Sequence, residues 1–332
     1  MLDSFGRNLN YLRVSVTDRC NLRCSYCMPE KGIQLMPHEE ILSFDEILKI
    51  IMVMSNLGVD RVRLTGGEPL VRKGIILLAN EIKKIKGINF LGLTTNGVLL
   101  ENMADDLKNA GIDGLNISLD TTDALRYEKI THKDELKSVL RGINKAIELN
   151  FNAIKINCVL SPESTLDDWI GVVSLAEKLP VDVRLIEWMP IADDARKSIF
   201  NSEMAFSHIE EVFGRPQPLN KTTGQGPARY WKIPGFTGNL GIIDAMSHNF
   251  CNMCNRLRLT ASGNLKLCLF YDVGISLKKL LRSGASNNEI ARELLIAVKN
   301  KPKQHQGIRK HSEDGTESPT IERNHGMYDL GG

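Results

Sequence analysis

A regular alternation of strand-like and helix-like segments is the feature that most limits what this chain can fold into. Between residues 11 and 213, short runs rich in β-branched residues recur, and amphipathic segments separate them. The expected strands are Leu12–Val16, Arg61–Thr65, Phe90–Thr95, Leu115–Leu119, Ile154–Leu160 and Val183–Trp188. The expected helices are Phe44–Leu57, Lys73–Lys84, Leu100–Ala110, Asp134–Leu149 and Asp167–Leu179. This order predicts an α/β fold with a parallel sheet and helical crossovers.

The number of repeating units decides between a closed and an open barrel. Six β/α units are fewer than the eight of a closed TIM barrel, so we expect a partial (β/α)6 TIM-type barrel of parallel strands over residues 1–213. Active sites in such sheets lie at the carboxyl ends of the strands. Cys20 follows the first expected strand directly and is therefore expected at that end.

The texture of the sequence changes after residue 213. Glycine and proline are dense over residues 214–241, which is typical of loops and turns. A hairpin is expected next, with strands Arg256–Thr260 and Leu265–Phe270 and with Cys268 on the return strand. A helix near Glu289–Val298 and a polar tail follow. We expect residues 214–332 to form a small C-terminal extension docked on the open side of the barrel.

Six of the seven cysteines form two triads. The first triad, C-x3-C-x2-C, consists of Cys20, Cys24 and Cys27; the second, C-x2-C-x13-C, consists of Cys251, Cys254 and Cys268. A structural zinc site or an ordinary four-cysteine iron–sulfur cluster takes four protein ligands, so each triad is one ligand short. A cubane held by three thiolates leaves one iron open. The spacing therefore predicts two 4Fe-4S clusters that each bind a further molecule.

Composition restricts the alternatives. The chain is 42% hydrophobic and 25% charged with a net charge of +2, which is ordinary for a globular protein and gives no reason to expect nucleic acid or a membrane as partner. We see no apolar leader at the N-terminus and no run near the roughly 18 apolar residues of a membrane span. We therefore expect a cytoplasmic protein, in which clustered cysteines are metal ligands before they are disulfides. For zinc at the first triad, His38 is the nearest fourth ligand.

The first triad lies in a recognisable motif. Arg13–Pro29, RVSVTDRCNLRCSYCMP, resembles the signature of the radical S-adenosylmethionine (SAM) superfamily. The resemblance implies a 4Fe-4S cluster whose open iron binds SAM, and reductive cleavage to a 5′-deoxyadenosyl radical that abstracts a substrate hydrogen. Thr65–Pro69, TGGEP, resembles the element that contacts the SAM amino group in that superfamily, which implies roles for Gly67 and Glu68. Neither a dinucleotide-binding G-x-G-x-x-G nor a P-loop motif occurs in the sequence.

The second triad narrows the family. Cys251–Leu269, CNMCNRLRLTASGNLKLCL, resembles the auxiliary-cluster segment of the GTP 3′,8-cyclase family of molybdenum cofactor biosynthesis, and this resemblance extends over essentially the whole chain. It implies a second 4Fe-4S cluster whose open iron binds the guanine of GTP, with arginines around the triphosphate. Arg256 and Arg258 alternate on the expected strand, so both side chains are expected in one cavity.

The resemblance also implies individual binding residues. The positions for GTP are Arg13, Arg63, Thr94, Lys155, Arg256, Leu257 and Arg258, and those for SAM are Tyr26, Gly67, Glu68, Ser118 and Met189. Gly331 and Gly332 match a C-terminal pair that is thought to reach the active site of the family. The ordinary interpretations stay open: core or turn packing for Ser118 and Met189, and a disordered end for the terminal glycines. Cys158 is expected to be a buried small hydrophobe.

The resemblance implies that GTP is converted to (8S)-3′,8-cyclo-7,8-dihydroguanosine 5′-triphosphate, the first step of molybdopterin synthesis. The adenosyl radical takes the ribose 3′ hydrogen, and the carbon radical attacks guanine C8. The implied partners are a flavodoxin- or ferredoxin-like reductant, cyclic pyranopterin monophosphate synthase as acceptor of the product, and a second copy of the chain in a homodimer. Two alternatives remain: another auxiliary-cluster radical SAM enzyme such as a peptide maturase, which should lack the arginine set, and a non-catalytic zinc or cluster scaffold.

Overall fold

A single curved sheet forms the centre of the protein. The computed structural model describes residues 1–28, 33–189, 198, 200–219, 226–271 and 273–305. Its strands are β1 (Tyr11–Ser15), β2 (Arg61–Thr65), β3 (Phe90–Thr95), β4 (Gly114–Ser118), β5 (Ala153–Leu160), β6 (Asp182–Glu187), β7 (Gln217–Leu219), β8 (Arg229–Lys232), β9 (Asn239–Ile243), β10 (Arg256–Leu259), β11 (Asn264–Lys266) and β12 (Gly274–Ser276). They form one twelve-stranded sheet in the order β12-β11-β10-β1-β2-β3-β4-β5-β6-β9-β8-β7.

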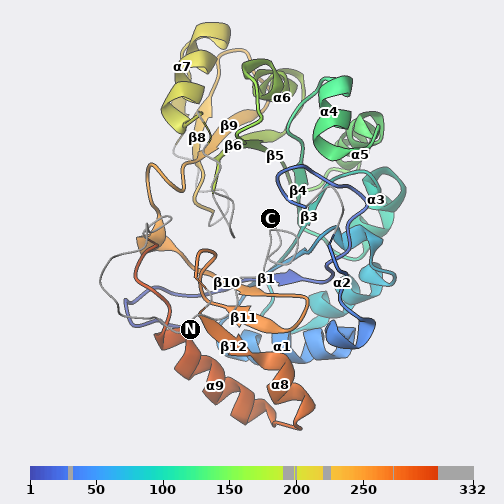
Figure 1. The fold of residues 1–332 in the computed structure, drawn as a ribbon, viewed down its shortest axis with the longest axis vertical. Helices are drawn as coiled ribbons and strands as arrows, with labels where there is room; N and C mark the ends of the chain where they lie inside the picture. The colour runs from blue at the N-terminus through green and yellow to red at the C-terminus, as the bar shows by residue number, and fades with distance from the viewer. Residues whose placement is uncertain (29–32, 190–197, 199, 220–225, 272, 306–332) are drawn as a thin grey trace.

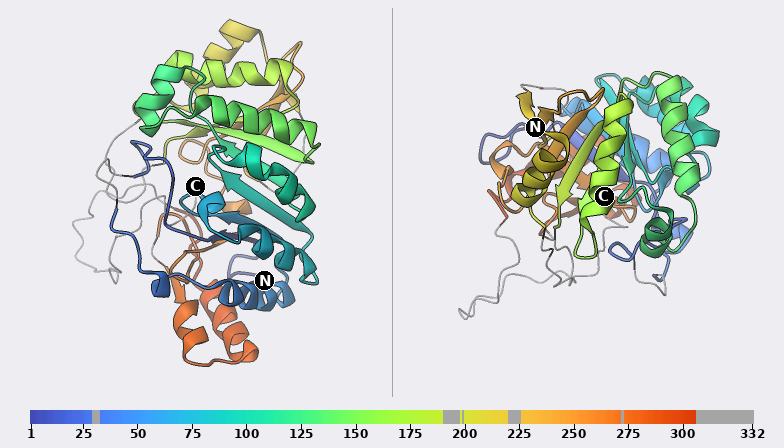
Figure 2. Two further views of the ribbon diagram at one scale, coloured as in Figure 1. Left: turned by 90° about the vertical axis from the view of Figure 1, so that its right-hand side faces the viewer. Right: turned by 90° about the horizontal axis from the view of Figure 1, so that it is seen from above.

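Helices lie around the outside of this sheet (Figure 1). They are α1 (Phe44–Asn56), α2 (Ile75–Lys84), α3 (Leu100–Asn109), α4 (Ala124–Thr131), α5 (Leu136–Glu148), α6 (Leu166–Lys178), α7 (Ser202–Phe213), α8 (Leu277–Arg282) and α9 (Asn287–Lys299), with short 3-10 helices η1 (His38–Glu40), η2 (Pro69–Val71) and η3 (Cys251–Met253). Helices α8 and α9 stand at one end of the molecule, where both contact α1 (Figure 2). None of the described helices is both long and apolar enough to cross a membrane.

The expected open, partial barrel is confirmed, but its parallel part is larger than predicted. Strands β1 to β6 are parallel neighbours, and β10 adds in parallel beside β1 while β9 adds in parallel beside β6. Eight parallel strands therefore replace the expected six. The edge strands β12 and β7 do not pair with each other in the described part of the chain, so the barrel stays open. The two extra strands, β9 and β10, come from beyond residue 213. Their pairing with distant strands could not be predicted, because a local sequence pattern carries no information on long-range pairing.

Several local expectations need correction. The Gly- and Pro-rich residues 214–241 were expected to be loops, yet they hold β7, β8 and part of β9, because their turns are those of an antiparallel hairpin. Strand β11 ends at Lys266, so Cys268 lies two residues beyond the return strand rather than on it. Helices α4, α7 and α8 were not predicted. The strands Arg61–Thr65 and Phe90–Thr95 have the predicted bounds.

The core lies between the sheet and its helices. Helix α1 begins with a capping box, in which Ser43 Oγ accepts the N–H of Glu46 and the Glu46 carboxylate accepts the N–H of Ser43. Its apolar face is fully buried, and Trp169 of α6 is the largest fully buried side chain. Cys158 is buried on β5, as expected.

Strand β1 joins the two cysteine triads. Its first residue, Tyr11, pairs with Arg256 and donates its backbone N–H to the carbonyl of Asn255, next to Cys254. Its last residue, Ser15, leads into the loop of Cys20. The triads therefore lie near opposite ends of β1, with the inner wall of the barrel between them.

Candidate active site

The first triad lies on the loop after β1. Its turn is closed by hydrogen bonds from the backbone N–H groups of Cys27 and Met28 to the carbonyl of Cys24, at 2.9 and 3.0 Å. Asn96 Nδ2, in the loop after β3, donates to Cys20 Sγ at 3.7 Å. Burial is the main cause that raises the pKa of all three thiols, that of Cys27 to about 12. Thiols that ionise poorly alone lose their protons when they bind a metal.

The Gly-Gly-Glu turn after β2 packs against the start of this loop. A Cβ on Gly67 would lie 2.3 Å from the carbonyl oxygen of Arg19, so only glycine fits. The backbone N–H of Gly67 donates to the carbonyl of Thr17 at 2.7 Å, and that of Glu68 donates to the carbonyl of Arg19 at 2.8 Å. The glycines therefore allow the backbone of this turn to pack closely against the backbone of residues 17–19, just before Cys20.

Glu68 connects this turn to the one after β3. Its carboxylate accepts the N–H of Leu70 at 3.0 Å, the hydroxyl of Thr95 at 2.8 Å and the N–H of Asn96 at 2.6 Å. Burial is the largest influence on Glu68 and raises its pKa to about 7, while the three donors act in the opposite direction. A carboxylate has about four acceptor sites, so Glu68 retains capacity for one further donor, such as an amino group.

The other residues expected at SAM lie at the same edge of the sheet. Ser118 ends β4, and Met189 follows β6. The Tyr26 hydroxyl donates to Asp120, and its ring packs edge-on against Trp188 with 6.2 Å between centroids. Burial raises the pKa of Asp120 to about 6. The carboxyl ends of β1, β2, β4 and β6 therefore bring together the residues that were predicted from separate segments.

The second triad lies at the other end of β1, on η3 and on the loop after β11. The N–H of Cys254 donates to the carbonyl of Cys251 at 3.2 Å, which closes the η3 turn. Burial acts to raise the pKa of Cys254, but the positive charges of Lys301 and Arg256 outweigh it and lower the pKa. Its surroundings are therefore cationic. The first triad differs, because Asp120 raises the pKa of Cys24 and Cys27 further.

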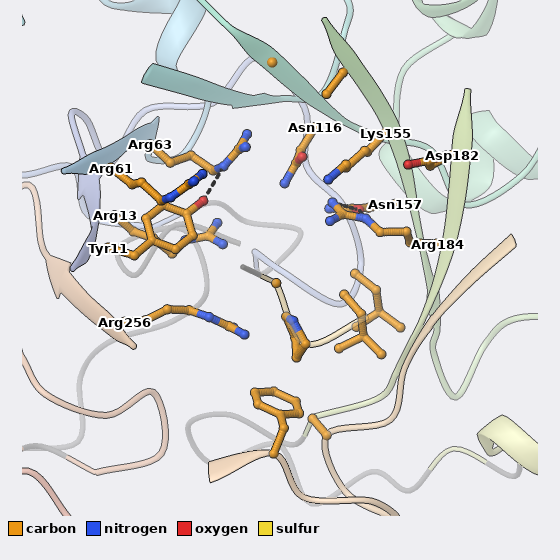
Figure 3. A pocket seen from close by; sticks show the side chains of 18 of the residues that line it. Tyr11, Arg13, Arg61, Arg63, Asn116, Lys155, Asn157, Asp182, Arg184 and Arg256 are labelled. Atoms are coloured by element: carbon orange, nitrogen blue, oxygen red, sulfur yellow. Dashed lines mark hydrogen bonds between the residues drawn. The ribbon is translucent and has the colours of Figure 1, made fainter. Parts of the chain in front are cut away.

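A cavity of about 710 Å³ occupies the interior of the barrel. Its wall includes all three cysteines of the second triad and, as far as the described residues go, none of the first. Eight basic side chains line it: Arg13, Arg61, Arg63, Lys155, Arg184, Arg256, Arg258 and Lys301. Asp182 is the one carboxylate in the described lining. Figure 3 shows Arg13, Arg61 and Arg63 facing Lys155 and Arg184 across the cavity.

Register places the cations in rows. Arg13 of β1 pairs with Arg258 of β10 on one side and with Arg63 of β2 on the other. Neighbouring strands lie roughly 4.8 Å apart, so these three side chains form an evenly spaced row. Guanidinium groups in such a row suit a chain of phosphates, since each can make paired hydrogen bonds to phosphate oxygens.

Unpaired polar atoms point to a polar ligand in this cavity. Nε and Nη2 of Arg13, Nε of Arg61 and Oδ1 of Asn116 are buried without a hydrogen-bond partner in the described part of the chain. Oγ1 of Thr94, which pairs with Asn116 between β3 and β4, is also unpartnered there, although Thr94 is not in the cavity wall. Such atoms are costly unless something satisfies them. Burial, together with the charge of Arg258, lowers the pKa of Arg13 well below its usual value, which reflects cations crowded without counter-charge.

Tyr11 was missed by the sequence analysis. Arg63 donates Nε–H to the Tyr11 hydroxyl at 2.6 Å and Nη1–H to the carbonyl of Leu93 at 2.7 Å (Figure 3). Burial acts to raise the pKa of Tyr11, but Arg63 and Arg13 lower it to about 8. The signal was available, because alternate residues of a strand share a face and Tyr11 is two residues from Arg13.

Three cavity cations, Arg61, Arg184 and Lys301, were also missed. Arg184 donates Nε–H and Nη2–H to Asn157 Oδ1 at 2.9 and 2.5 Å, which fixes its side chain on the β6 side. Of the residues predicted for GTP, Thr94 and Leu257 do not belong to the cavity wall. Thr94 is a buried residue of β3, and the side chain of Leu257 is fully buried in the hydrophobic core, which leaves only its backbone for a ligand. The terminal Gly331 and Gly332 lie outside the described residues.

Both triads offer the all-thiol ligand set that iron–sulfur clusters take, and both lie on loops able to present it. Within the described part of the chain, no three His, Cys, Asp or Glu side chains are arranged to hold a single metal ion. The unpaired donors of Arg13 and Arg61 fit a bound polyanion, and the retained acceptor capacity of Glu68 fits a bound amino group. The residues present therefore fit two clusters, SAM and a nucleotide.

Comparison with known families agrees with this arrangement. Residues 14–176 match the Radical SAM superfamily, and residues 181–307 match the family described as Molybdenum Cofactor Synthesis C. A "GTP 3′,8-cyclase" of Desulforamulus reducens is 42% identical over 95% of this chain and 96% of its own length. The "Molybdenum cofactor biosynthesis protein 1" of Homo sapiens is 41% identical over 93% of this chain. The chain spans about half of that relative, 49% of its length.

Solved structures agree on the fold. Streptococcus suis SuiB bound to precursor peptide SuiA is 14% identical, with a TM-score of 0.60 over 90% of this chain and 66% of that one. Native anSMEcpe with bound AdoMet is 16% identical, with a TM-score of 0.57 over 90% and 82% of the two chains. At these identities the likeness concerns the fold alone. On the strength of the near full-length relatives, the chain belongs to the GTP 3′,8-cyclase family of the radical SAM superfamily.

Proposed function

We propose that this chain is a GTP 3′,8-cyclase that converts GTP to (8S)-3′,8-cyclo-7,8-dihydroguanosine 5′-triphosphate, the first step of molybdenum cofactor biosynthesis. The observation that carries the proposal is the cationic cavity, which has the second triad in its wall. Strand β1 contributes Tyr11 and Arg13 to this wall and leads at its carboxyl end to the first triad. A peptide substrate gives no reason for eight basic residues in one interior cavity. When bound, the first cluster and SAM supply the radical that removes the ribose 3′ hydrogen of GTP.

Different parts of the cavity bind the triphosphate, the base and the ribose of GTP. The row of Arg258, Arg13 and Arg63 binds the triphosphate, and the Tyr11 hydroxyl holds Arg63 in place. The base lies at the second triad, whose cysteines line the same cavity. The ribose is then directed toward the carboxyl ends of the strands, where Met189 belongs to the cavity wall.

The chain's contribution to the chemistry is mainly positional. It holds C3′ of the ribose within reach of the radical and keeps C8 of guanine close to C3′, which replaces an encounter in solution by a fixed geometry. The half-buried loop of the first triad, packed against the turns after β2 and β3, limits the access of water to a reactive intermediate. No general acid or base is required for hydrogen abstraction.

Other parts of the proposal concern the second cluster and the partners. Cys251, Cys254 and Cys268 hold a second 4Fe-4S cluster. Residues 1–213 form the radical SAM barrel, which also contributes Arg13 and Arg63 to GTP binding, and residues 214–332 form the extension that carries the second cluster and further GTP-binding residues. A flavodoxin- or ferredoxin-like protein delivers the electrons, the working form is a homodimer, and cyclic pyranopterin monophosphate synthase takes up the product. These assignments rest on membership of the family and on the two-triad layout.

The test is performed on protein with clusters rebuilt without oxygen, which should hold roughly eight irons per chain if both are cubanes. SAM and dithionite are added with GTP, with ATP or with no nucleotide, and 5′-deoxyadenosine and nucleotide loss are quantified. We expect GTP alone to stimulate 5′-deoxyadenosine release, with matching loss of GTP. Equal release with every nucleotide would contradict the assignment of GTP as substrate.

A further inference from the structure

The segment after α9 returns to the second triad and brings a buried lysine to it. Lys301 is 3% exposed and lines the central cavity. Its Nζ donates to the carbonyl of Arg256 at 3.0 Å and to the carbonyl of Leu267 through a short hydrogen bond. Arg256 is two residues after Cys254, and Leu267 immediately precedes Cys268. One ammonium group therefore ties together two cysteine-bearing segments that are separated by a hairpin.

A second buried cation secures the third cysteine. Arg7, which is 8% exposed, donates to the carbonyl of Cys251 at 2.7 Å and to those of Pro302 and Lys303 at 2.8 and 2.9 Å. Its Nε–H is paired with Asp3 at 2.6 Å. The segment of residues 301–303 is thus connected to every cysteine segment of the second triad, either through Lys301 or through Arg7.

The charges of these two cations are compensated differently. Arg7 has the carboxylate of Asp3 beside it, whereas the anionic groups that act on Lys301 in the described part of the chain are the thiolates of Cys254 and Cys268. A buried ammonium group without a carboxylate partner is unfavourable by itself. It becomes favourable when a negatively charged group occupies the space beside it, as a thiolate-ligated cluster does.

We propose that Lys301 is a positioning residue for the second cluster, which aligns the Cys254 and Cys268 segments and raises the reduction potential of the cluster. The inference deepens the proposed function and rests on its second cluster. Reduction adds one negative charge to a cluster, and a nearby buried cation stabilises that charge through a low-dielectric medium. Net charge and hydrogen bonding around the sulfurs are the means by which proteins set such potentials.

A higher reduction potential at the second cluster than at the first suits the proposed reaction. The first triad lies beside Glu68 and Asp120, which disfavour added negative charge there, while Arg23 near Cys20 offsets part of their effect. The second triad lies beside Lys301, Arg256 and Arg258. The second cluster is therefore the easier of the two to reduce, and it shares a cavity with the substrate whose product radical must accept an electron.

The experiment isolates the second cluster in the full chain by replacing Cys20, Cys24 and Cys27 with alanine. In this background Lys301→Gln removes the charge and keeps an N–H donor, Lys301→Arg keeps the charge, and Lys299→Gln removes an exposed charge from the same stretch of chain. Each protein is loaded without oxygen. Iron and sulfide are counted, and the midpoint potential is measured by a redox titration followed by electron paramagnetic resonance.

We expect about four irons per chain in the background protein. Lys301→Gln should retain its cluster at a lower midpoint potential, while Lys301→Arg and Lys299→Gln should keep the background potential. An unchanged potential in Lys301→Gln would overturn the tuning role. Loss of iron from Lys301→Gln and Lys301→Arg alike would show that Lys301 has only a structural role, and would also overturn the proposed effect on the reduction potential. A background protein that binds no iron would instead refute the second cluster of the proposed function, and the inference with it.

Discussion

Replacing Gly67 by alanine tests how the Gly-Gly-Glu turn after β2 positions the loop of the first triad. The new Cβ would lie 2.3 Å from the carbonyl oxygen and 2.7 Å from the carbonyl carbon of Arg19, and 2.9 Å from the carbonyl oxygen of Asp18. All three contacts are backbone atoms, which have no flexible end to move aside. Because a carbon requires roughly 3.5 Å from its neighbours, the two segments must separate by about 1 Å.

That separation breaks the backbone hydrogen bonds from Gly67 to Thr17 and from Glu68 to Arg19, now 2.7 and 2.8 Å long. Two buried hydrogen bonds left unmade cost about 2–6 kcal/mol together. The segment that moves leads directly into Cys20, so the first triad should be displaced as well. We expect Gly67→Ala to lower the denaturation midpoint strongly and to abolish cleavage of SAM.

The assay compares wild type, Gly67→Ala and Gly284→Ala by thermal denaturation, iron content and 5′-deoxyadenosine release. Gly284 lies in the turn between α8 and α9 with a φ of +84°, and an added Cβ would meet no atom within 4 Å. Only left-handed strain of roughly 1–2 kcal/mol therefore applies there. The reasoning is refuted if Gly67→Ala retains both the stability and the SAM cleavage of Gly284→Ala.

Three further substitutions test other parts of the account. Tyr11→Phe leaves the Nε–H of Arg63 without its acceptor and should weaken GTP binding about 5- to 30-fold, measured by calorimetry, with the iron content unchanged. Arg258→Ala should weaken GTP binding about 10-fold or more, since a charge-assisted hydrogen bond contributes about 1.5–3 kcal/mol, whereas the exposed Arg215→Ala should not; loss of iron in Arg258→Ala would count against a role in GTP binding. Trp169→Ala removes the largest fully buried side chain and should lower the free energy of unfolding by about 3–5 kcal/mol, as measured by denaturant titration; a change below about 1 kcal/mol would show that its packing matters little.

The sequence predicts those parts of the fold that local patterns encode. Strand β2 and strand β3 have the predicted bounds because both are short, largely apolar runs flanked by turn residues. The additions of β10 beside β1 and of β9 beside β6 were not predicted, since pairing between distant segments depends on packing rather than on local sequence. The antiparallel strands β7 and β8 were not predicted either, because a short strand within a Gly- and Pro-rich stretch has too few residues to show alternation.

The candidate site divides in the same way. The two cysteine triads are visible because the spacing of their cysteines can be read directly along the sequence, within one loop for the first triad and across one hairpin for the second. Lys301 is not, because it acquires its role from partners on other elements, namely β10 and the loop after β11. For Tyr11, alternation with Arg13 could have indicated the cavity-facing side, but its hydrogen bond with Arg63 depends on β2. Glu68 was predicted, but its function as a link between two turns, through Thr95 and Asn96, depends on the neighbouring strand.

The most direct test of the central claim follows one hydrogen atom. The loaded protein is supplied with SAM, dithionite and GTP deuterated at the ribose 3′ carbon, and 5′-deoxyadenosine is analysed by mass spectrometry. If the cavity holds GTP with C3′ toward the radical, one deuterium should appear in 5′-deoxyadenosine for each GTP consumed. GTP deuterated at C2′ should transfer none. Release of 5′-deoxyadenosine without deuterium from the 3′ position would contradict the account.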